Sequence, residues 1–476
     1  MNTKNRPIFY KSGSLPSSEI VNVPQKLSRQ KSLGFPQVSE AQAMRHYTYL
    51  STLNHGVDSG FYPLGSCTMK YNYKLLEKVA NMPEFNNVHP WQEQVDVQGT
   101  LEVMHELNVM LSEILGYSSF TLQPVAGSHG EHTGLLIIRA YLESIGEVDR
   151  KVVLVPDTAH GTNPASAAIA GFSVRKVASQ ADGNLDLDAL KKEVANHKVA
   201  ALMLTNPSTL GLFESQILEI ADIVHKAGGL LYYDGANANA LLGVIRPGDM
   251  GFDVCHLNLH KTFGTPHGGG GPGSGPVGVK DFLVPFLPNP SVAKVGGEYA
   301  LKYSPSSIGK VHGFYGNVSV LLKAYVYILL HGSDGLKAVS RRAIINANYL
   351  QDNIRKFIKL AYDRTCMHEF VISAQKLKKD YGISALDIAK RLIDYGVHPP
   401  TIYFPQIVHE CLMIEPTESE TKESLDDFIE VMSKIVEEAK TNPEIIKKSP
   451  QTRVVGRLDE ARAVKESKLT AFDIRT

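Results

Sequence analysis

The most chemically suggestive stretch of the sequence is residues 256–275, which read HLNLHKTFGTPHGGGGPGSG. It places Lys261 directly after an apolar segment and just before a run rich in glycine and proline. A lysine that follows a strand is normally solvated, so position alone says little. A lysine that acts as a nucleophilic amine must instead be desolvated enough to lose its proton near neutral pH. A strand end beside a glycine-rich turn offers that environment, and we therefore interpret Lys261 as a candidate reactive amine.

Two further acid–base side chains follow strand-like segments. Asp234 ends the apolar segment 229–234, and His160 follows the apolar segment 151–156. In a parallel sheet, functional groups collect at the carboxyl ends of the strands. Each residue alone has an ordinary structural explanation, since an aspartate at a strand end most often forms a turn. Together with Lys261, they predict a single site.

A helix start supplies a candidate anion site. The sequence Gly127-Ser128-His129-Gly130 precedes a helix predicted over 131–142. Backbone N–H groups in the first turn of a helix are unpaired and bind phosphate readily, although ordinary helix capping is the alternative explanation. An amine, an acid for a ring nitrogen, an aromatic ring and a phosphate cradle are the groups that pyridoxal phosphate requires.

The elements that would position these residues alternate between strand and helix. Apolar strands are predicted at 151–156, 199–205, 229–234 and 252–259, and amphipathic helices at 185–197 and 214–227. Continuous apolar strands separated by helices predict an α/β fold with a mostly parallel sheet covered by helices on both faces.

The C-terminal part of the sequence has a different character. Long charged helices are predicted at 336–360, 384–395 and 420–440, with strand candidates at 368–374 and 410–415. This pattern predicts a smaller α+β domain. We therefore expect an N-terminal arm and extended segment over 1–100, a large cofactor-binding domain over 101–330 and a small C-terminal domain over 331–476. The basic first 38 residues weakly resemble an organellar presequence, and we interpret them as an arm of the mature protein.

Composition narrows the range of functions. The 476 residues include 49 Lys and Arg against 49 Asp and Glu, and this zero net charge argues against nucleic-acid and anionic-membrane partners. No apolar run approaches the roughly 18 residues that cross a bilayer. The four cysteines lie far apart, so we expect neither a zinc site nor a disulfide framework, and a reducing, cytoplasmic compartment.

Several blocks of the sequence resemble the glycine decarboxylase P-protein of the glycine cleavage system. The block around the lysine, 256–272, is highly specific, and the likeness covers most of the chain through 60–70, 123–131, 157–164, 205–214 and 233–237. The P-protein of many organisms is one long chain with two related halves, and this chain resembles only the second, cofactor-carrying half. The resemblance implies subunit 2 of a split form, with a separate subunit 1 as partner in an α2β2 heterotetramer.

The resemblance also implies a type I pyridoxal-phosphate fold and a role for each site residue. Lys261 would form the Schiff base, Asp234 would pair with the ring nitrogen, and Ala236 and His160 would contact the two ring faces. Gly127, Ser128 and His129 would hold the phosphate, and His260 would contact phosphate or substrate. Thr209 would contact the ring hydroxyl, and Ser66 and Thr68 would contact the glycine carboxylate. No metal is implied.

The implied reaction is the decarboxylation of glycine. Glycine would displace Lys261 from the cofactor and lose carbon dioxide, and the remaining carbanion would attack the lipoyl disulfide of the H-protein. The site must exclude water so that the carbanion is not simply protonated. We expect Gly268–Gly275 to be a mobile turn that brings backbone close to the cofactor.

Three other functions stay open. A stand-alone pyridoxal-phosphate decarboxylase or aminotransferase is one, and an aminotransferase would need an arginine such as Arg364 or Arg391 for a second carboxylate. A non-catalytic binding subunit is another, although Lys261 speaks against it. The third is a metal hydrolase or metal-binding protein built on His256, His260 and His267.

Overall fold

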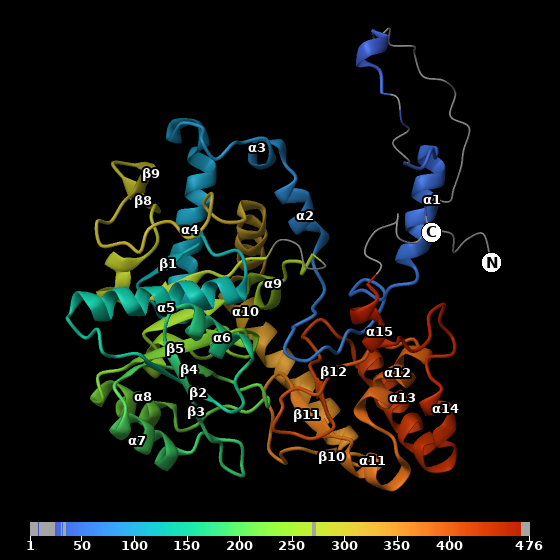
Figure 1. The fold of residues 1–476 in the computed structure, drawn as a ribbon. Coiled ribbons are helices and arrows are strands. Elements are labelled where there is room, and N and C mark those ends of the chain that lie inside the picture. The colour runs from blue at the N-terminus through green and yellow to red at the C-terminus, as the bar shows by residue number, and fades with distance from the viewer. Residues whose placement is uncertain (1–7, 9–23, 30, 32–34, 269–272, 468–476) are drawn as a thin grey trace. The chain divides into compact units, whose positions relative to one another are not determined.

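The computed structural model describes residues 8, 24–29, 31, 35–268 and 273–467. The chain separates into two compact units, one made of residues 61–452 and the other of residues 1–60 and 453–476 (Figure 1). In the second unit, α1 (Glu40–Ser51) begins at a capping box formed by Ser39 and Gln42, and α15 (Glu460–Lys465) is capped by Asp459. Most of the expected arm over 1–38 lies outside the described residues, as do 269–272 of the expected glycine turn.

A seven-stranded sheet forms the centre of the larger unit. Its strands are β1 (Ser119–Thr121), β2 (Val152–Pro156), β3 (Ser173–Val177), β4 (Val199–Thr205), β5 (Leu230–Gly235), β6 (Val254–Leu257) and β7 (Val277–Val279). Their order is β1-β7-β6-β5-β4-β2-β3, and β7 runs antiparallel to both of its neighbours. The other neighbouring pairs are parallel, which confirms the predicted mostly parallel sheet.

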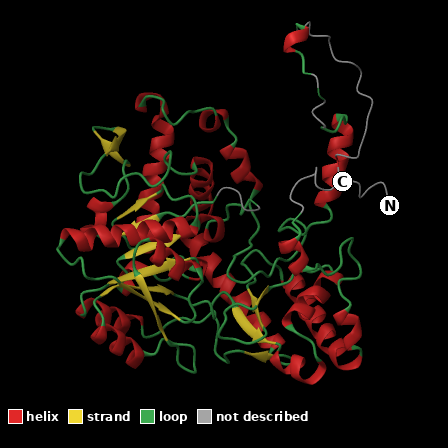
Figure 2. Cartoon of the chain, viewed as in Figure 1, coloured by secondary structure: helices red, strands yellow, loops and turns green. Residues whose placement is uncertain are grey.

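Helices cover both faces of this sheet (Figure 2). Successive strand residues point to opposite faces, so Tyr232 and Tyr233 belong to two different hydrophobic cores. The core around Tyr232 includes residues of α5 (Gly127–Ser144) and α6 (Thr162–Ile169). The core around Tyr233 includes residues of α4 (Gln98–Leu115), α7 (Leu187–Asn196), α8 (Ile217–Lys226) and α10 (Val318–Ile354).

A second, antiparallel sheet lies toward the C-terminus of the same unit. Its order is β10-β11-β13-β12, with β10 (Lys359–Leu360), β11 (Phe370–Ser373), β12 (Thr401–Ile402) and β13 (Cys411–Ile414). The helices that follow or separate these strands are α11 (Gln375–Tyr381), α12 (Ala385–Asp394), α13 (Lys422–Thr441) and α14 (Pro443–Lys447). The predicted α+β character is confirmed, and the domain limits near residues 100 and 330 stay a prediction.

Several elements differ from the sequence prediction. The helix predicted to begin at residue 336 begins at Val318, and its helical backbone is interrupted at Gly332. The elements that the sequence did not single out include the helices α4 and α6, the strands β1, β3 and β7, and a hairpin of β8 (Ser291–Val295) and β9 (Glu298–Lys302). The segment 1–100 also contains the short helices α2 (Lys74–Ala80) and α3 (Pro83–Asn86). Most of these elements are too short to show a clear period, and the five residues of β3 are largely exposed. No helix among the described residues is long and apolar enough to span a membrane.

The segment 61–73 is fixed against the C-terminal sheet. The Gly65 N–H donates to the Met413 carbonyl at 3.2 Å, and the Glu415 N–H donates to the Pro63 carbonyl at 3.3 Å. A Cβ on Gly65 would lie 2.3 Å from the Met413 side chain, so only glycine permits this approach. Ser66 and Thr68, which follow, have left-handed backbone with φ of 66° and 49°.

A substitution at Gly211 tests how closely the loop after β4 packs against the segment before β11. Its φ is +74°, and an added Cβ would lie 1.8 Å from the Glu369 carbonyl oxygen. Gly211→Ala should lower the free energy of unfolding by about 2–5 kcal/mol, because backbone strain and steric overlap add. Urea unfolding of the protein measures this. The matched control is Gly146→Ala, where φ is +79° but nothing lies within 4 Å; a loss as large there would contradict the steric explanation.

Candidate active site

Lys261 lies in α9 (Leu259–Thr262), a short helix directly after β6. The turn is closed by a hydrogen bond from the Lys261 N–H to the Asn258 carbonyl at 3.0 Å. The side chain is half-buried. Across the described part of the chain, no hydrogen bond or ion pair joins the Lys261 Nζ to a protein atom, so the amine is free to react.

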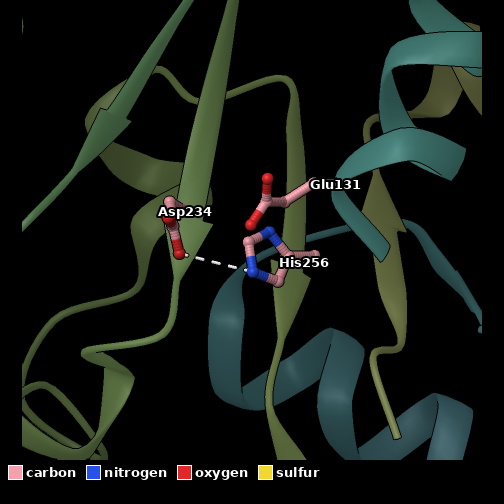
Figure 3. A group of neighbouring side chains, drawn as sticks. All are labelled: Glu131, Asp234 and His256. Atoms are coloured by element: carbon pink, nitrogen blue, oxygen red, sulfur yellow. Dashed lines mark ion pairs between the residues drawn. The ribbon is translucent and has the colours of Figure 1, made fainter. Parts of the chain in front are cut away.

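Asp234 is a buried carboxylate at the end of β5. Its Oδ2 accepts a hydrogen bond from the Asn163 Nδ2 at 2.9 Å, and its Oδ1 accepts one from the Ala236 N–H at 3.0 Å. The His256 Nε2 lies 3.3 Å from Oδ1 (Figure 3). Burial by itself would raise the pKa of Asp234, but the imidazole, the amide and the N–H outweigh burial and lower it. The carboxylate therefore stays ionised at neutral pH.

His256 connects Asp234 to a second buried carboxylate, that of Glu131 on α5 (Figure 3). The His256 Nδ1 lies 3.1 Å from the Tyr232 hydroxyl, which fixes the orientation of the imidazole ring. Glu131 accepts hydrogen bonds from the Thr162 and Ser166 hydroxyl groups at 2.7 and 2.8 Å. Side chains from β5, β6, α5 and α6 thus hold Asp234 in place, in the manner of an outer shell around a reactive group.

His160 lies in the exposed loop between β2 and α6. Its Nδ1 accepts a hydrogen bond from the Thr162 N–H at 3.2 Å and lies 2.8 Å from the Thr162 hydroxyl. Because Thr162 also bonds to Glu131, this loop is tied to the residues around Asp234. The ring of Phe404 meets the His160 ring edge-on, with 5.4 Å between centroids. The contacts with Thr162 and Phe404 therefore fix the orientation of the His160 ring, as stacking on a cofactor would require.

The predicted phosphate cradle is the first turn of α5. This turn contains Gly127, Ser128 and His129, and no side chain caps it. A Cβ on Gly127 would lie 2.7 Å from the Asn258 amide, and one on Gly275 would lie 2.0 Å from the Ala126 carbonyl oxygen. The backbone here is thus packed closely against the residues on either side of Lys261. No side chain caps the N–H groups of this turn, so they can bind an anion.

His260 and His267 form a pair of neutral imidazoles beside Lys261. Their ring centroids lie 5.2 Å apart. Burial lowers the pKa of His260 to about 3, and the repulsion that a proton on this ring would meet from His267, Lys261 and His256 adds to the effect. Burial and the charge of Lys261 lower the pKa of His267 to about 4. Both rings are therefore uncharged at neutral pH and can act as hydrogen-bond donors or acceptors.

These surroundings fit a polar cofactor with a phosphate group. Buried polar groups normally have hydrogen-bond partners, and unpartnered ones call for an explanation. At the end of β4 and in the segment that contains Lys261, the described residues include several buried polar side-chain atoms without a partner: those of Thr205, Asn258, His260, Thr265, His267 and Ser274. Their number and position beside a free amine, an ionised carboxylate and an uncapped helix start match the groups that pyridoxal phosphate offers.

The remaining predicted site residues have contacts of their own. The Ser66 N–H donates to Glu369 Oε2 at 2.7 Å, and the Thr68 hydroxyl donates to Glu415 Oε1 at 2.5 Å. The Thr209 hydroxyl donates to the Thr158 carbonyl at 2.6 Å. Ala236 follows Asp234 and binds it through its N–H. The expected contacts of Ser66, Thr68, Thr209 and Ala236 with substrate or cofactor stay predictions.

The structure adds two carboxyl groups that the sequence did not single out. Glu369 and Glu415 are buried with 0% and 1% of their side chains exposed. The antiparallel register pairs Phe370 with Ile414, so the two glutamates lie opposite each other one step beyond that pair. The sequence does show that each acid lies near the end of a predicted strand. It does not show that the two acids lie opposite each other, because that depends on the register between β11 and β13.

The metal-site alternative and the aminotransferase alternative lose support. Within the described ranges, the groups that could hold a metal are Glu131–Asp234–His256 and His368–Glu369–Glu415, not the trio of histidines on which the metal-site alternative depends. Arg391 forms two hydrogen bonds to Glu438, at 2.7 and 2.8 Å. Arg364 bonds to the Asp182 carbonyl and to Asn184. Both guanidinium groups are therefore engaged by protein atoms.

Comparison with known proteins defines the class of the fold. Residues 130–270 match the family described as aminotransferase class-V. Among solved structures, the chain is similar to an inhibitor-bound glycine decarboxylase (P-protein) of the glycine cleavage system, with a TM-score of 0.71 and 20% identity over 87% of this chain and 93% of that one. An apo cysteine desulfurase from Thermococcus onnurineus NA1 gives a TM-score of 0.61 and 14% identity over 80% and 95% of the two chains. The chain therefore has the type I fold of pyridoxal-phosphate-dependent enzymes.

Closer relatives define the family. Residues 339–454 match the family described as glycine dehydrogenase, C-terminal domain. The probable glycine dehydrogenase (decarboxylating) subunit 2 of Caldanaerobacter subterraneus subsp. tengcongensis is 59% identical over 93% of this chain and 91% of its own length. The corresponding protein of Treponema denticola is 58% identical over 93% and 92%. The chain belongs to the glycine dehydrogenase (decarboxylating) subunit 2 family.

The lowered pKa of Asp234 predicts how its contribution to stability depends on pH. A carboxyl whose pKa is lower in the folded state stabilises the fold above its ordinary pKa of 3.8, and this contribution is lost as the pH falls through the lowered value. Asp234→Asn should therefore be less stable than the unchanged protein at neutral pH, with a difference that shrinks in acid. Urea unfolding over a pH series measures this; a difference that grows in acid would contradict the assignment.

Proposed function

We propose that this chain decarboxylates glycine with pyridoxal phosphate and transfers the aminomethyl group to the lipoyl arm of the H-protein. Membership of the glycine dehydrogenase subunit 2 family supports this reaction. The structural observation that carries the proposal is the free amine of Lys261 after β6, next to the buried, ionised carboxylate of Asp234 at the end of the adjacent strand β5. When bound, pyridoxal phosphate supplies an aldehyde for amines and a ring that accepts the electrons of a breaking bond.

Lys261 and Asp234 divide the acid–base work. Lys261 would hold the cofactor through its amine, and its Nζ would take up a proton when it is not bound to the cofactor. Asp234 accepts a hydrogen bond from the ring nitrogen and keeps a proton on that nitrogen, which makes the ring a better electron acceptor. His256 and Asn163 serve this role indirectly, because they keep the carboxylate ionised and hold its orientation.

The other residues bind and orient. The first turn of α5, at Gly127 and Ser128, holds the phosphate through backbone N–H groups. In this proposal His129 contacts the phosphate, and His260 contacts the phosphate or the substrate. His160 stacks on one face of the cofactor ring, and Ala236 contacts the opposite face. Thr209 contacts the ring hydroxyl, and Ser66 and Thr68 contact the glycine carboxylate.

The chain works with protein partners in this proposal. The names of its relatives specify a subunit 2, which implies a subunit 1, and we propose an α2β2 heterotetramer. The lipoylated H-protein is the second partner. A stand-alone decarboxylase or aminotransferase is the competing function, and the engagement of Arg364 and Arg391 by other residues argues against the aminotransferase.

Exchange of labelled bicarbonate into glycine tests the reaction. The co-produced two-subunit complex should catalyse this exchange, and adding lipoylated H-protein should stimulate it strongly. Lys261→Ala should lower the rate by more than about a thousandfold, because the amine that binds the cofactor is lost. The control is Lys198→Ala, at a lysine with 64% of its side chain exposed. Exchange that does not respond to H-protein would contradict the proposal.

Paired substitutions of His160 test its stacking role. His160→Ala should weaken cofactor binding about 2- to 10-fold, the range expected when an aromatic contact is lost. His160→Phe keeps a flat ring and should retain most of the affinity. Cofactor titrations followed by absorbance measure both. Equal weakening by the two substitutions would show that stacking is not what His160 contributes.

A further inference from the structure

Lys70 is a buried lysine that the proposed roles do not use, and it lies beside the segment that carries Lys261. Only 3% of the Lys70 side chain is exposed, and its Nζ lies 2.7 Å from Glu418 Oε1. Burial lowers the pKa of Lys70, and the charge of Glu418 opposes that effect. Burying an ammonium group is costly unless the group is paired and hydrogen-bonded. The other contacts of this Nζ therefore indicate what the buried charge does.

One of these contacts is with the backbone of α9. The Lys70 Nζ donates a hydrogen bond to the carbonyl of Thr262, the last residue of this helix, at 2.9 Å. The four residues of α9 are too few to pair their last carbonyl groups within the helix. The Asn72 Nδ2 adds a second bond, to the Gly264 carbonyl at 2.9 Å. Two side chains of the segment 61–73 thus hold the backbone directly after Lys261.

The turn at Gly264 packs closely against the same group of side chains. Its φ is +63°, and an added Cβ would lie 2.8 Å from the Tyr327 ring and 3.7 Å from the Lys70 side chain. Tyr327, on α10, is 1% exposed. The Lys70 Nζ lies 5.2 Å from the centroid of the Tyr327 ring and 3.2 Å from its hydroxyl. The backbone after α9 therefore rests on a buried aromatic ring and on Lys70 itself.

The network also reaches the segment that follows Asp234. The Lys70 Nζ donates to the Asn239 Oδ1 at 2.8 Å. Asn239 lies in the short 3-10 helix η5 (Ala238–Ala240), which follows β5. Glu418 accepts hydrogen bonds from the Asn239 Nδ2 and the Tyr327 hydroxyl, each at 3.3 Å. One ammonium group is therefore bonded to the segments that follow both functional side chains.

We propose that Lys70, held by Glu418, sets the position of Lys261 relative to Asp234 by binding the last carbonyl of α9. This inference rests on the proposed function of Lys261 and Asp234 as the amine and the acid that bind the cofactor. Lys70 is a positioning residue, because it acts on the cofactor only through the backbone that carries Lys261. Reactive side chains need such support, since small displacements from the productive geometry are costly.

A purely structural ion pair between Lys70 and Glu418 is the competing explanation. Removing one partner of a buried pair destabilises a protein strongly, because the other charge is left unpaired. Replacing both partners by uncharged groups of similar volume is often neutral for stability. The double variant Lys70→Met/Glu418→Gln therefore separates the two explanations, because it removes both charges together with the donor to Thr262.

Hydrogen exchange of the backbone amides at 259–264 tests the proposal in the cofactor-free, full-length protein. In the double variant these amides should exchange about 10- to 100-fold faster, the range that corresponds to one lost hydrogen bond to a charged group. The reason is that α9 opens more readily without its anchor at Thr262. The urea midpoint of the double variant should stay close to that of the unchanged protein, whereas Lys70→Met alone should lower it.

Circular dichroism of bound pyridoxal phosphate provides a second readout. This signal depends on how the cofactor ring is oriented in its asymmetric surroundings. At saturating cofactor the double variant should give a weaker signal than the unchanged protein, because Lys261 is no longer fixed relative to Asp234. A structural ion pair alone would leave the signal of the folded variant unchanged.

Lys323→Met/Glu77→Gln is the matched control. Lys323 is a second buried lysine, on the same helix as Tyr327, and its Nζ also lies 2.7 Å from a glutamate oxygen, Oε1 of Glu77. Within the described residues, Lys323 has no hydrogen bond to α9. The control should leave both the exchange at 259–264 and the dichroism unchanged. Changes as large as those in the Lys70 double variant would overturn the proposal, because loss of any buried pair would then suffice.

Two further outcomes decide the remaining cases. A folded Lys70 double variant with unchanged exchange at 259–264 and unchanged dichroism would overturn the proposal in favour of a structural ion pair. If that variant does not fold, Asn72→Ala decides: it leaves the ion pair intact and should raise exchange at 259–264 about 2- to 10-fold, and unchanged exchange would overturn the proposal. The exchange measurement uses neither glycine nor H-protein, so its failure is distinct from a failed bicarbonate exchange.

Discussion

A carboxylate that stays ionised inside the protein is the constraint on which the rest of the site depends. Asp234 is 2% exposed, and burial alone would favour its neutral form. Three donors from three different elements reverse that preference: Asn163 on α6, His256 on β6 and the Ala236 N–H after β5. The parallel pairing of β5 with β6 places Asp234 directly beside His256. The sheet is thus the means by which the negative charge is held.

The same site holds carboxyl groups in the opposite state. Glu369 is as deeply buried as Asp234, but its nearest titratable neighbours are a second carboxyl and an imidazole that stays neutral. Environment, not residue type, decides which acid is ionised. Burial raises the pKa of Asp234 and of Glu415, and the positive charge of Lys261 acts in the opposite direction on both.

The sequence predicted the parts of the site that are marked by local patterns, such as a polar residue directly after an apolar strand. Lys261, Asp234 and His160 all follow strands whose apolar runs are plain in the sequence, and the structure places Asp234 and Lys261 at the ends of adjacent strands. The four predicted strands of the central sheet and the parallel pairing are confirmed. The helix start predicted at Gly127–Gly130 is the first turn of α5, and its role in holding a phosphate stays a prediction.

The parts that were missed depend on contacts between distant segments. Glu369 and Glu415 meet only because β11 and β13 pair antiparallel in one register. The donors that bind them come from Ser66 and Thr68, about 300 residues earlier, through backbone conformations that non-glycine residues seldom adopt. His256 was considered as a metal ligand together with His260 and His267, whereas the pairing of β5 with β6 brings it to Asp234. No periodic pattern in the sequence encodes such pairings.

The protonation state of the cofactor ring nitrogen tests the central claim most directly. Pyridoxal phosphate labelled with nitrogen-15 in the ring, bound to the two-subunit complex, reports that state through its chemical shift. With Asp234 ionised beside it, the nitrogen should be protonated near neutral pH, and Asp234→Asn should remove the proton. A ring nitrogen that is unprotonated in the unchanged complex, or equally protonated in the variant, would contradict the account.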